Sequence, residues 1–311
     1  WANRRRTRRK ERAVRVNPLY MNDLVSSLDA SSSTEQTLTQ ELASGSRVNQ
    51  LSDDPVAVGE NVLLSAEIGN DDTFSQTAST TESKLQVSDS VLGTVVSQLT
   101  SAISLATEAN NGTLNASDVE SVGNQMAGIR DEVVSLANTM YLGQYIFSGS
   151  QGSTSPYTLD TATMPATAAY QGDGDVSYLE TPSGQKIQLN VPGDQIFSAA
   201  GADVLGTLNA LVADYSTGVP AATAEADTAA LSTALGHVSQ QRVSLDTSLS
   251  RLTAAATYTQ GEQTQLTAAQ TTLMQADVGQ IATQLSTAET QQAALSQVIA
   301  KLGQQSLFND L

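Results

Sequence analysis

The sequence predicts a mainly α-helical protein: a long antiparallel helical rod or coiled coil formed by the N- and C-terminal parts, with a small β-rich insertion at the far end. Three observations indicate this fold. Apolar residues near both ends recur at alternating spacings of three and four, which is the pattern of a helix with a narrow buried seam. Aromatic residues make up only 4% of the chain, which disfavours a large globular core. Residues 146–197 show short apolar alternations between turn-forming residues, as strands do.

The clearest helical stripe lies near the C-terminal end of the sequence and begins at Met274. Its seam contains two weak positions in succession, Ala288 and Gln292. Truncating a buried Leu to Ala typically costs about 2–5 kcal/mol, so we expect this helix to be frayed in the free chain and to order on assembly. The C-terminal half of the predicted assembly seam is Val278, Ile281, Leu285, Leu295, Ile299 and Leu302.

A matching stripe lies near the N-terminal end of the sequence. Pro18 suits the start of a helix and Gly45 suits its end. The polar residues Ser31 and Glu35 interrupt the stripe, as polar residues also interrupt the C-terminal one. The N-terminal half of the predicted seam is Leu24, Leu28, Leu38 and Leu42. We expect the two stripes to pack against each other, with the helices between them bringing their ends together.

A helix start follows this first helix. Ser52 or Asp53 is expected to cap the helix, with Pro55 in its first turn. Acidic residues at this point also suit the positive end of the helix dipole. The pair Asp53 and Asp54 is therefore interpreted as a helix cap and not as a metal site.

Helical patterns continue through the middle of the chain. They predict helices over residues 56–109, 119–140, 203–215 and 231–256. Gly69 marks a place for a bend in the first of these. Arg242 occupies a seam position of the last one, where we expect it either to extend its charged end to solvent or to pair with an acid. A polar residue at such a position can also fix the register of two helices.

These patterns divide the chain into four predicted parts. They are a basic leader, residues 1–13; a terminal helical pair, residues 14–52 plus 265–311; a helical rod domain, residues 53–145 plus 198–264; and a β-rich insertion domain, residues 146–197. The leader has no apolar segment of the kind that a secretory signal needs. We expect it to be non-native or disordered, with Val14 as the native start.

The charge of the chain is uneven. Residues 1–12 hold seven of the fifteen Lys and Arg residues, against the single acid Glu11. The rest of the chain carries 8 basic and 31 acidic residues. Such an acidic body disfavours nucleic acid and anionic membranes as partners. No apolar stretch suited to membrane insertion is expected either.

No constellation of residues for catalysis, cofactor binding or metal binding stands out. The chain has no Cys, which removes thiol nucleophiles and cysteine metal sites. His237 is the only histidine, and it supports no Ser/His/Asp arrangement. Asp173 and Asp175, between two Gly residues, are too few carboxylates for a calcium loop, so a hairpin turn is expected there. We expect no enzymatic activity, no cofactor and no metal.

Two segments resemble the signature of the bacterial flagellin superfamily: Leu42-Ala43-Ser44-Gly45-Ser46-Arg47-Val48-Asn49 and Asp53-Asp54-Pro55-Val56-Ala57. Three further features resemble the hook-associated protein 3 (FlgL) family within that superfamily. They are the opening Arg15-Val16-Asn17-Pro18 to Leu28, the segment Gln144-Tyr145-Ile146-Phe147-Ser148-Gly149, and the ending Ser306-Leu307-Phe308-Asn309. The likeness covers nearly everything after residue 13, although the basic leader departs from the family.

The resemblance implies a secreted, extracellular structural subunit of the bacterial flagellum that forms the hook–filament junction after type III export. It also implies several partners: identical subunits in a ring, the first hook-associated protein (FlgK), flagellin, and an export chaperone at the C-terminal helix. Because four polar residues cluster at a turn, we expect them to form contacts between subunits at the bend after the first helix. They are Arg47, Asn49, Asp53 and Asp54.

Two other functions remain open from the sequence. A flagellin subunit of the filament is the nearest alternative, and it would polymerise alone into long filaments. A secreted helical effector or translocator belongs to a different class, whose usual mark is an apolar segment that inserts into membranes.

Overall fold

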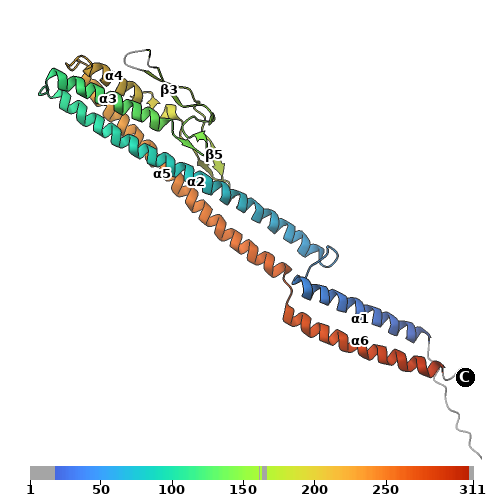
Figure 1. The fold of residues 1–311 in the computed structure, drawn as a ribbon. Coiled ribbons are helices and arrows are strands. Elements are labelled where there is room, and N and C mark those ends of the chain that lie inside the picture. The colour runs from blue at the N-terminus through green and yellow to red at the C-terminus, as the bar shows by residue number, and fades with distance from the viewer. Residues whose placement is uncertain (1–17, 161, 163–166, 308–311) are drawn as a thin grey trace, which may run out of the picture. The chain divides into compact units, whose positions relative to one another are not determined.

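The structure, a computed structural model, describes residues 18–160, 162 and 167–307. The predicted basic leader, residues 1–13, and the predicted start at Val14 lie outside the described residues. Within them, helices dominate, and short strand pairs form a small β-rich region, which confirms the predicted fold class. The helices are α1 (Pro18–Ser44), α2 (Pro55–Asn110), α3 (Ala116–Ala137), α4 (Val204–Tyr215), α5 (Ala224–Met274) and α6 (Val278–Leu307), as Figure 1 shows.

The chain forms two compact units, and each is described by itself. The first unit contains the described residues up to Glu67 together with those from Leu266 onward. The second unit contains residues Ile68–Gln265. Helices α2 and α5 contribute residues to both units. The four-part division made from the sequence stays a proposal.

In the first unit, α1 packs against α6 in antiparallel orientation (Figure 1). The Ser31 hydroxyl donates to the carbonyl oxygen of Ala288 at 3.5 Å. Further along, Leu38 lies in one cluster with Ile281. Contacts that lie further along α1 thus involve residues with lower numbers on α6, so the two helices run in opposite directions. Gly45 follows the last residue of α1 with φ +68°, the left-handed conformation that favours glycine at a helix end, which confirms the predicted stop.

The predicted C-terminal stripe is not one helix. Helix α5 ends at Met274, and α6 begins at Val278. Between them Gln275 forms an antiparallel bridge with Ser46 of the first connection. The Asp277 carboxylate then accepts the backbone N–H of Gln280 at 3.1 Å, so it caps the new helix. Because the bridge and the cap satisfy backbone groups, the helix is interrupted without leaving them unpaired.

The second unit is built on α2 and α5, which run antiparallel (Figure 1). The Asn110 amide on α2 donates to the Thr228 hydroxyl on α5 at 3.1 Å. Helices α3 and α4 pack against each other beside them. The buried core of this unit includes Leu92, Leu99, Met126, Leu208, Leu211, Leu231, Val238 and Leu252.

The sequence-based helix limits were partly wrong. Helix α2 is continuous through Gly69, as predicted for residues 56–109, and the bend expected at Gly69 stays a prediction. Helix α3 begins before Val119, at a cap where the Asn115 side chain accepts the backbone N–H of Asp118 at 3.0 Å. It ends at Ala137, and Met140 opens a strand instead of closing the helix. Met140 keeps the three-and-four spacing of the apolar stripe, although the backbone at Met140 is no longer helical.

The ion pair expected at Arg242 is present in the second unit. Its Nε donates to Asp89 Oδ1 at 2.8 Å, and a second guanidinium nitrogen donates to Asp89 Oδ2 at 3.1 Å. The Asp89 carboxylate raises the pKa of Arg242. Gly93 lies beside the guanidinium, where a Cβ would stand 3.5 Å from its carbon. The pairing is confirmed, and its role in fixing the register stays a prediction.

The β-rich region of the second unit consists of antiparallel strand pairs. They are β1 (Met140–Tyr141) with β2 (Gln144–Tyr145), β3 (Tyr157–Asp160) with β4 (Thr167–Tyr170), β5 (Tyr178–Glu180) with β6 (Lys186–Gln188), and β7 (Ser198–Ala199) with β8 (Ala202–Asp203). A short 3-10 helix, η1 (Gly193–Gln195), precedes β7. Strand pairs thus form on both sides of the predicted insertion as well as inside it.

Aromatic side chains hold this β-rich region together. Phe197 makes edge-on contacts with Phe147 and Tyr157, with ring centroids 5.4 and 5.9 Å apart. The Tyr157 hydroxyl donates to the carbonyl oxygen of Gly193 at 2.9 Å, and burial raises the pKa of Tyr157. Burial likewise raises the pKa of Tyr170 to about 12. Both tyrosines therefore stay neutral hydrogen-bond donors at physiological pH.

Helix α2 is the one described helix that is long and apolar enough, by length and composition alone, to cross a membrane. Length and composition alone do not overturn the expectation that the chain has no apolar stretch suited to membrane insertion, and that expectation stays a prediction. One 18-residue window of α2 is apolar enough for a membrane span, and 33% of that window is buried inside the protein. Leu92, Val95 and Leu99 of α2 are fully buried in the second unit, as in the core helix of a folded domain. The window alone is weak evidence for a membrane span.

Candidate assembly site

The first unit carries the residues of the predicted assembly seam. Leu38 of α1 and Ile281 of α6 are buried against each other, together with Ala276 of the connecting segment. Leu285 is half-buried against this cluster. The remaining inward positions of the seam are also only half-buried: Leu24, Leu28, Leu295, Ile299 and Leu302. One protein chain thus covers its own seam incompletely.

Two predicted seam residues are exposed. Leu42 is 38% exposed and Val278 is 54% exposed. Both lie where α1 ends and α6 begins, at the same level of the antiparallel pair. Ala276 is buried at that level instead of them. The segment between α5 and α6 passes beside the end of α1, where the backbone N–H of Ala276 donates to the carbonyl oxygen of Gly45. A single chain therefore does not bury these two residues, and their place in an assembly seam stays a prediction.

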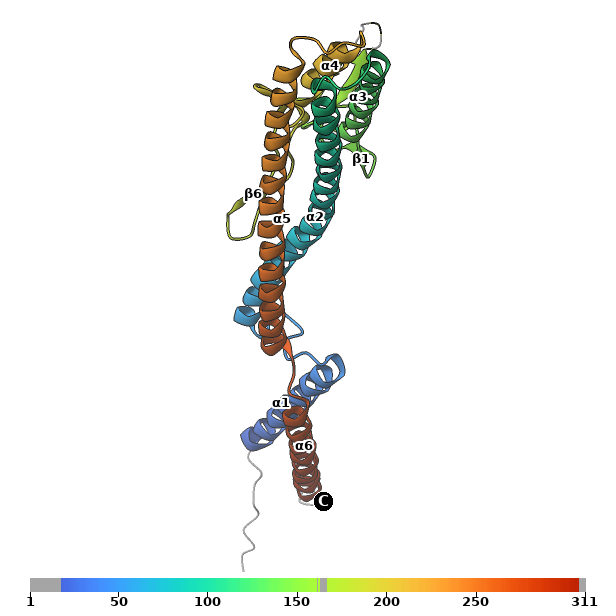
Figure 2. The same cartoon turned by 90° about the vertical axis from the view of Figure 1, so that its left-hand side faces the viewer.

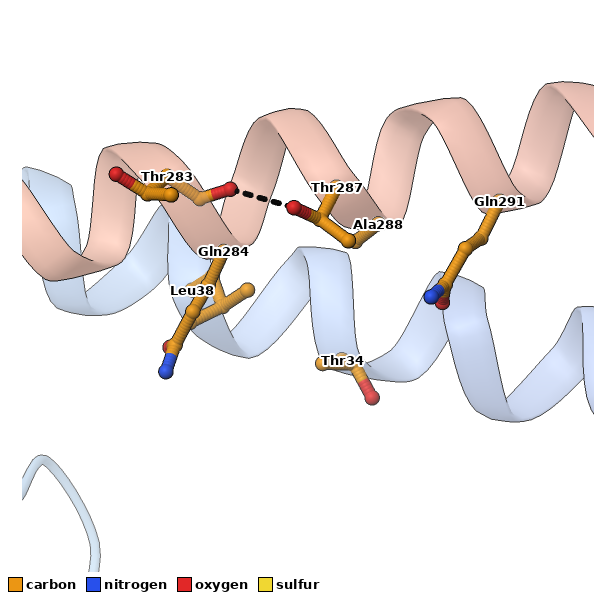
Figure 3. A pocket seen from close by; sticks show the side chains of 7 residues that line it. All are labelled: Thr34, Leu38, Thr283, Gln284, Thr287, Ala288 and Gln291. Carbon is orange, nitrogen blue, oxygen red and sulfur yellow. Dashed lines mark hydrogen bonds between the residues drawn. The ribbon is translucent and has the colours of Figure 1, made fainter.

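A shallow groove of about 380 Å³ runs between α1 and α6. Figure 3 shows Leu38 between the two helices, with the Gln284 side chain of α6 extending across α1 beside it. The Thr287 hydroxyl donates to the carbonyl oxygen of Thr283 within α6 at 2.9 Å. The small side chain of Ala288, one of the two weak positions, leaves the groove unfilled. Its full lining is Thr34, Leu38, Thr283, Gln284, Thr287, Ala288 and Gln291, which includes no charged side chain.

The connection between α1 and α2 is tied to the end of α5 by Arg47. Its guanidinium donates to Asp54 Oδ2 from two nitrogens, at 3.1 and 3.2 Å. It also donates to the carbonyl oxygen of Leu273 at 3.2 Å. Backbone bonds add to this contact, since the N–H of Arg47 donates to the carbonyl oxygen of Met274 at 2.8 Å. Arg47 therefore joins two segments that lie far apart in the sequence.

Asn49 and Asp53 close the turn itself. The Asp53 carboxylate accepts the backbone N–H groups of Asn49 and Gln50, at 3.0 and 2.8 Å. The Asn49 amide donates to the carbonyl oxygen of Ser46 at 3.0 Å. These contacts are made inside the chain. A role of the four polar residues between subunits stays a prediction.

Helix α2 is capped by Asp54, and not by Ser52 or Asp53 as the sequence suggested. Asp54 Oδ1 accepts the backbone N–H of Ala57 at 3.0 Å, and Pro55 is the first helical residue. Asp53 is already used by the turn that precedes the helix. The N–H of Ala57, and after it the Arg47 guanidinium, hold the pKa of the Asp54 carboxyl below its usual value.

We expect the Asp54 contacts to weaken only in strong acid. The folded pKa of Asp54 is lowered, so its contribution to stability is present above the unfolded pKa, about 3.9, and is lost as pH falls through the folded value. An NMR titration of the Ala57 amide should therefore show a midpoint below the usual Asp value. Asp54→Asn should keep the cap and abolish this titration, and Arg47→Ala should move the midpoint upward. A wild-type midpoint at or above the usual value would contradict the assignment.

Sequence reasoning missed two other residues of this connection. The Ser46 hydroxyl lies within hydrogen-bond distance of the carbonyl oxygens of Val48 and Met274, at 2.9 and 3.1 Å, and its single proton can be donated to either. Asp277 caps α6, as described above. Asp277 carried a readable signal, because Asp before a helical stripe is a common cap. The partner of Ser46 is more than two hundred residues away, so no local signal pointed to it.

Asp173 and His237, two of the three residues considered for chemistry, have structural contacts. The Asp173 carboxylate accepts the backbone N–H of Ser150 at 2.7 Å and the Ser150 hydroxyl at 2.5 Å, and these bonds lower the pKa of Asp173. His237 Nε2 lies 2.7 Å from the carbonyl oxygen of Gln195. Among the residues that the structure describes, no group of three or more His, Cys, Asp or Glu side chains lies close enough together to hold a metal ion.

Paired terminal helices with a narrow apolar seam, and a helical middle with a small β-rich region, define a flagellin-like structural protein. The model of the bacterial flagellin N-terminal helical region matches residues 17–152. Flagellar hook-associated protein 3 of Escherichia coli is 26% identical over 68% of this chain and 73% of its own length. Flagellar hook-associated protein 3 of Salmonella typhimurium is 32% identical over 52% of this chain and 50% of its own length.

A solved structure shares the fold. It is that of a protein described as a flagellar hook-associated protein from Vibrio parahaemolyticus, with a TM-score of 0.62 at 20% identity, covering 71% of this chain and 99% of the other. The chain is thus similar to flagellar hook-associated protein 3 of two bacteria and, over residues 17–152, to the bacterial flagellin N-terminal helical region. The names of these relatives mark them as components of the bacterial flagellum.

Proposed function

We propose that this chain is a structural subunit of the hook–filament junction, without catalytic activity. The observation that carries the proposal is the seam between α1 and α6, which the chain leaves mostly half-buried. Exposed apolar surface of this kind marks a place where another protein binds. In an assembly, neighbouring helices would cover the seam positions that one chain leaves open.

The small core of the first unit supports the proposal that α1 and α6 become fully ordered only when subunits assemble. Its buried apolar cluster consists of Leu38, Ala276 and Ile281, with Leu285 packed against it. Fully burying one large apolar side chain contributes about 1.5–3 kcal/mol, and two of these residues are large. Ordering the two helices costs conformational entropy at every residue. We therefore propose that the terminal pair gains much of its stability from neighbouring subunits.

The proposed partners follow from the half-buried seam between α1 and α6 and from the resemblance to hook-associated protein 3. Identical subunits form a ring through the terminal helices. The ring lies between the first hook-associated protein (FlgK) and flagellin, outside the cell. The chain reaches that place through type III export, and a chaperone covers the apolar side of α6 before export. A chain without Cys avoids disulfide cross-links during such a passage.

Deletion of the gene tests the junction role. Cells without it are expected to keep their hooks, to lack filaments, and to shed unpolymerised flagellin into the medium. Re-expression of the chain should restore filaments. Normal filaments on the deletion strain would contradict the proposal. If this chain were itself the flagellin of the filament, the deletion strain would shed no other flagellin, and the purified chain would form filaments on seeding.

A further inference from the structure

The hairpin β1–β2 presents an apolar residue in a strained conformation. Leu142 has φ +48°, and it is the one non-glycine residue with positive φ among the described residues. Gly143 follows with φ +80°, so both central residues of this two-residue turn are left-handed. Turns of this type prefer Asn-Gly or Asp-Gly, because a bulky side chain disfavours positive φ. A leucine here makes the isolated chain less stable than an asparagine would.

The strained leucine is also exposed. Leu142 is 78% exposed, and Met140 on the adjoining strand is 50% exposed. Tyr141 between them packs against the buried core of the second unit. The base of the hairpin is fixed, because the backbone N–H of Tyr145 donates to the carbonyl oxygen of Gly152 at 2.8 Å. The hairpin thus holds an apolar tip away from the protein, which folding alone does not require.

The same unit carries an unfilled groove along α5. It has a volume of about 740 Å³, it is shallow and wide open to solvent, and every residue that lines it belongs to α5. The small side chains of Ser250 and Ala254 leave a hollow between Leu249 and Tyr258. Tyr258 is 66% exposed, although aromatic side chains bury large areas when they find a partner. The full lining is Asp246, Leu249, Ser250, Thr253, Ala254, Thr257 and Tyr258.

We propose that the β1–β2 tip of one copy inserts Leu142 into the α5 groove of a second copy. Figure 2 shows the hairpin and α5 on opposite sides of α2, so a copy does not fill its own groove. The tip residues Leu142 and Gly143 are uncharged, and the hollow between Leu249 and Tyr258 is apolar. A projection on one face and a groove on another form a head-to-tail contact, which repeats into a ring or a helical array. This inference rests on the proposed junction role and names a contact within its ring.

Cysteine cross-linking tests the contact, because the chain has no Cys of its own. In cells whose own gene is deleted, the double variant Leu142→Cys with Ala254→Cys replaces the chain, and flagella are isolated and oxidised. A disulfide needs Cβ atoms about 3.5–4.5 Å apart, so a ladder of covalent multimers of this chain is expected only if tip and groove meet. Each single variant should give no ladder.

A matched pair controls for chance collisions. Gln240 is also exposed on α5, and it lies 14 residues from Ala254, about 21 Å along the helix at 1.5 Å per residue. Leu142→Cys with Gln240→Cys should therefore give no ladder. Intact filaments without a ladder in the first double variant would overturn the contact while leaving the junction role standing. Cross-links to another flagellar protein would overturn the choice of a second copy as partner. Absence of any effect of gene deletion would instead reject the junction role.

The variant Leu142→Asn tests the strain argument. Asparagine tolerates positive φ, so the thermal midpoint of the purified monomer should rise by about 2–4 °C, the shift expected for relief of one strained residue. The number of filaments per cell should fall, because the apolar tip is lost. Val219→Asn, at another exposed apolar residue of the second unit, should change neither quantity. An unchanged filament number in Leu142→Asn would overturn the proposal.

Discussion

Replacing Ile281 by Asp is expected to separate α1 from α6 in the purified chain. Ile281 is buried against Leu38 and Ala276, so a carboxylate there would lie in an apolar cluster. An unpaired charge in an apolar site costs several kcal/mol, which exceeds the roughly 1.5–3 kcal/mol that one buried Ile contributes. The terminal pair has too small a core to absorb that loss.

Hydrogen exchange measures this effect residue by residue. Amides of α1 and α6 should lose protection in Ile281→Asp, while amides in the core of the second unit keep theirs. Val278→Asp is the matched control. Both residues occupy positions of the same apolar stripe, but Val278 is exposed in the structure and Ile281 is buried. Cells that carry Ile281→Asp should also lose motility. Equal loss of protection in the two variants would show that the seam is placed wrongly.

Replacing Phe197 by Ala is expected to destabilise the second unit by about 3–5 kcal/mol, the usual cost of emptying a buried aromatic site. Phe197 is fully buried, and its ring contacts the rings of both Phe147 and Tyr157. Tyr157 in turn bonds the carbonyl oxygen of Gly193. Loss of the Phe197 ring therefore loosens several strand connections at once.

Urea unfolding of the purified chain checks this expectation. The midpoint of the transition assigned to the second unit should fall markedly in Phe197→Ala. Tyr178→Ala supplies the comparison, because Tyr178 lies in β5 and is 58% exposed. Surface substitutions of this kind usually change stability by less than about 0.5 kcal/mol. Similar midpoints for the two variants would mean that the aromatic cluster does not support the β-rich region.

The helices could be predicted because their signals are local. The apolar period runs through α1, and Gly45 ends it with the backbone conformation that only glycine adopts readily. Pro55 was likewise placed correctly in the first turn of α2. The pairing of Arg242 with an acid followed from a charged residue in a seam position. Each of these conclusions needs only residues within a few turns of one another.

The candidate site was predicted less completely, since burial depends on segments that are distant in sequence. Leu42 and Val278 have the correct spacing for the seam, yet the chain between α5 and α6 crosses at their level and buries Ala276 instead. The residue that caps α2 is Asp54 and not the predicted Ser52 or Asp53, because the Asp53 carboxylate already accepts backbone N–H groups of the preceding turn. No periodic signal distinguishes these outcomes.

The sequence by itself determined that the chain is mainly helical, that its ends carry matching seams, and that it resembles the flagellin superfamily. These properties depend on local spacing and on short motifs. Only the tertiary structure decided where the C-terminal stripe breaks, which seam residues are buried, and that Leu142 stands exposed on a strained turn. The physical reason is that backbone pairing and burial are settled between segments that meet only after the chain has folded.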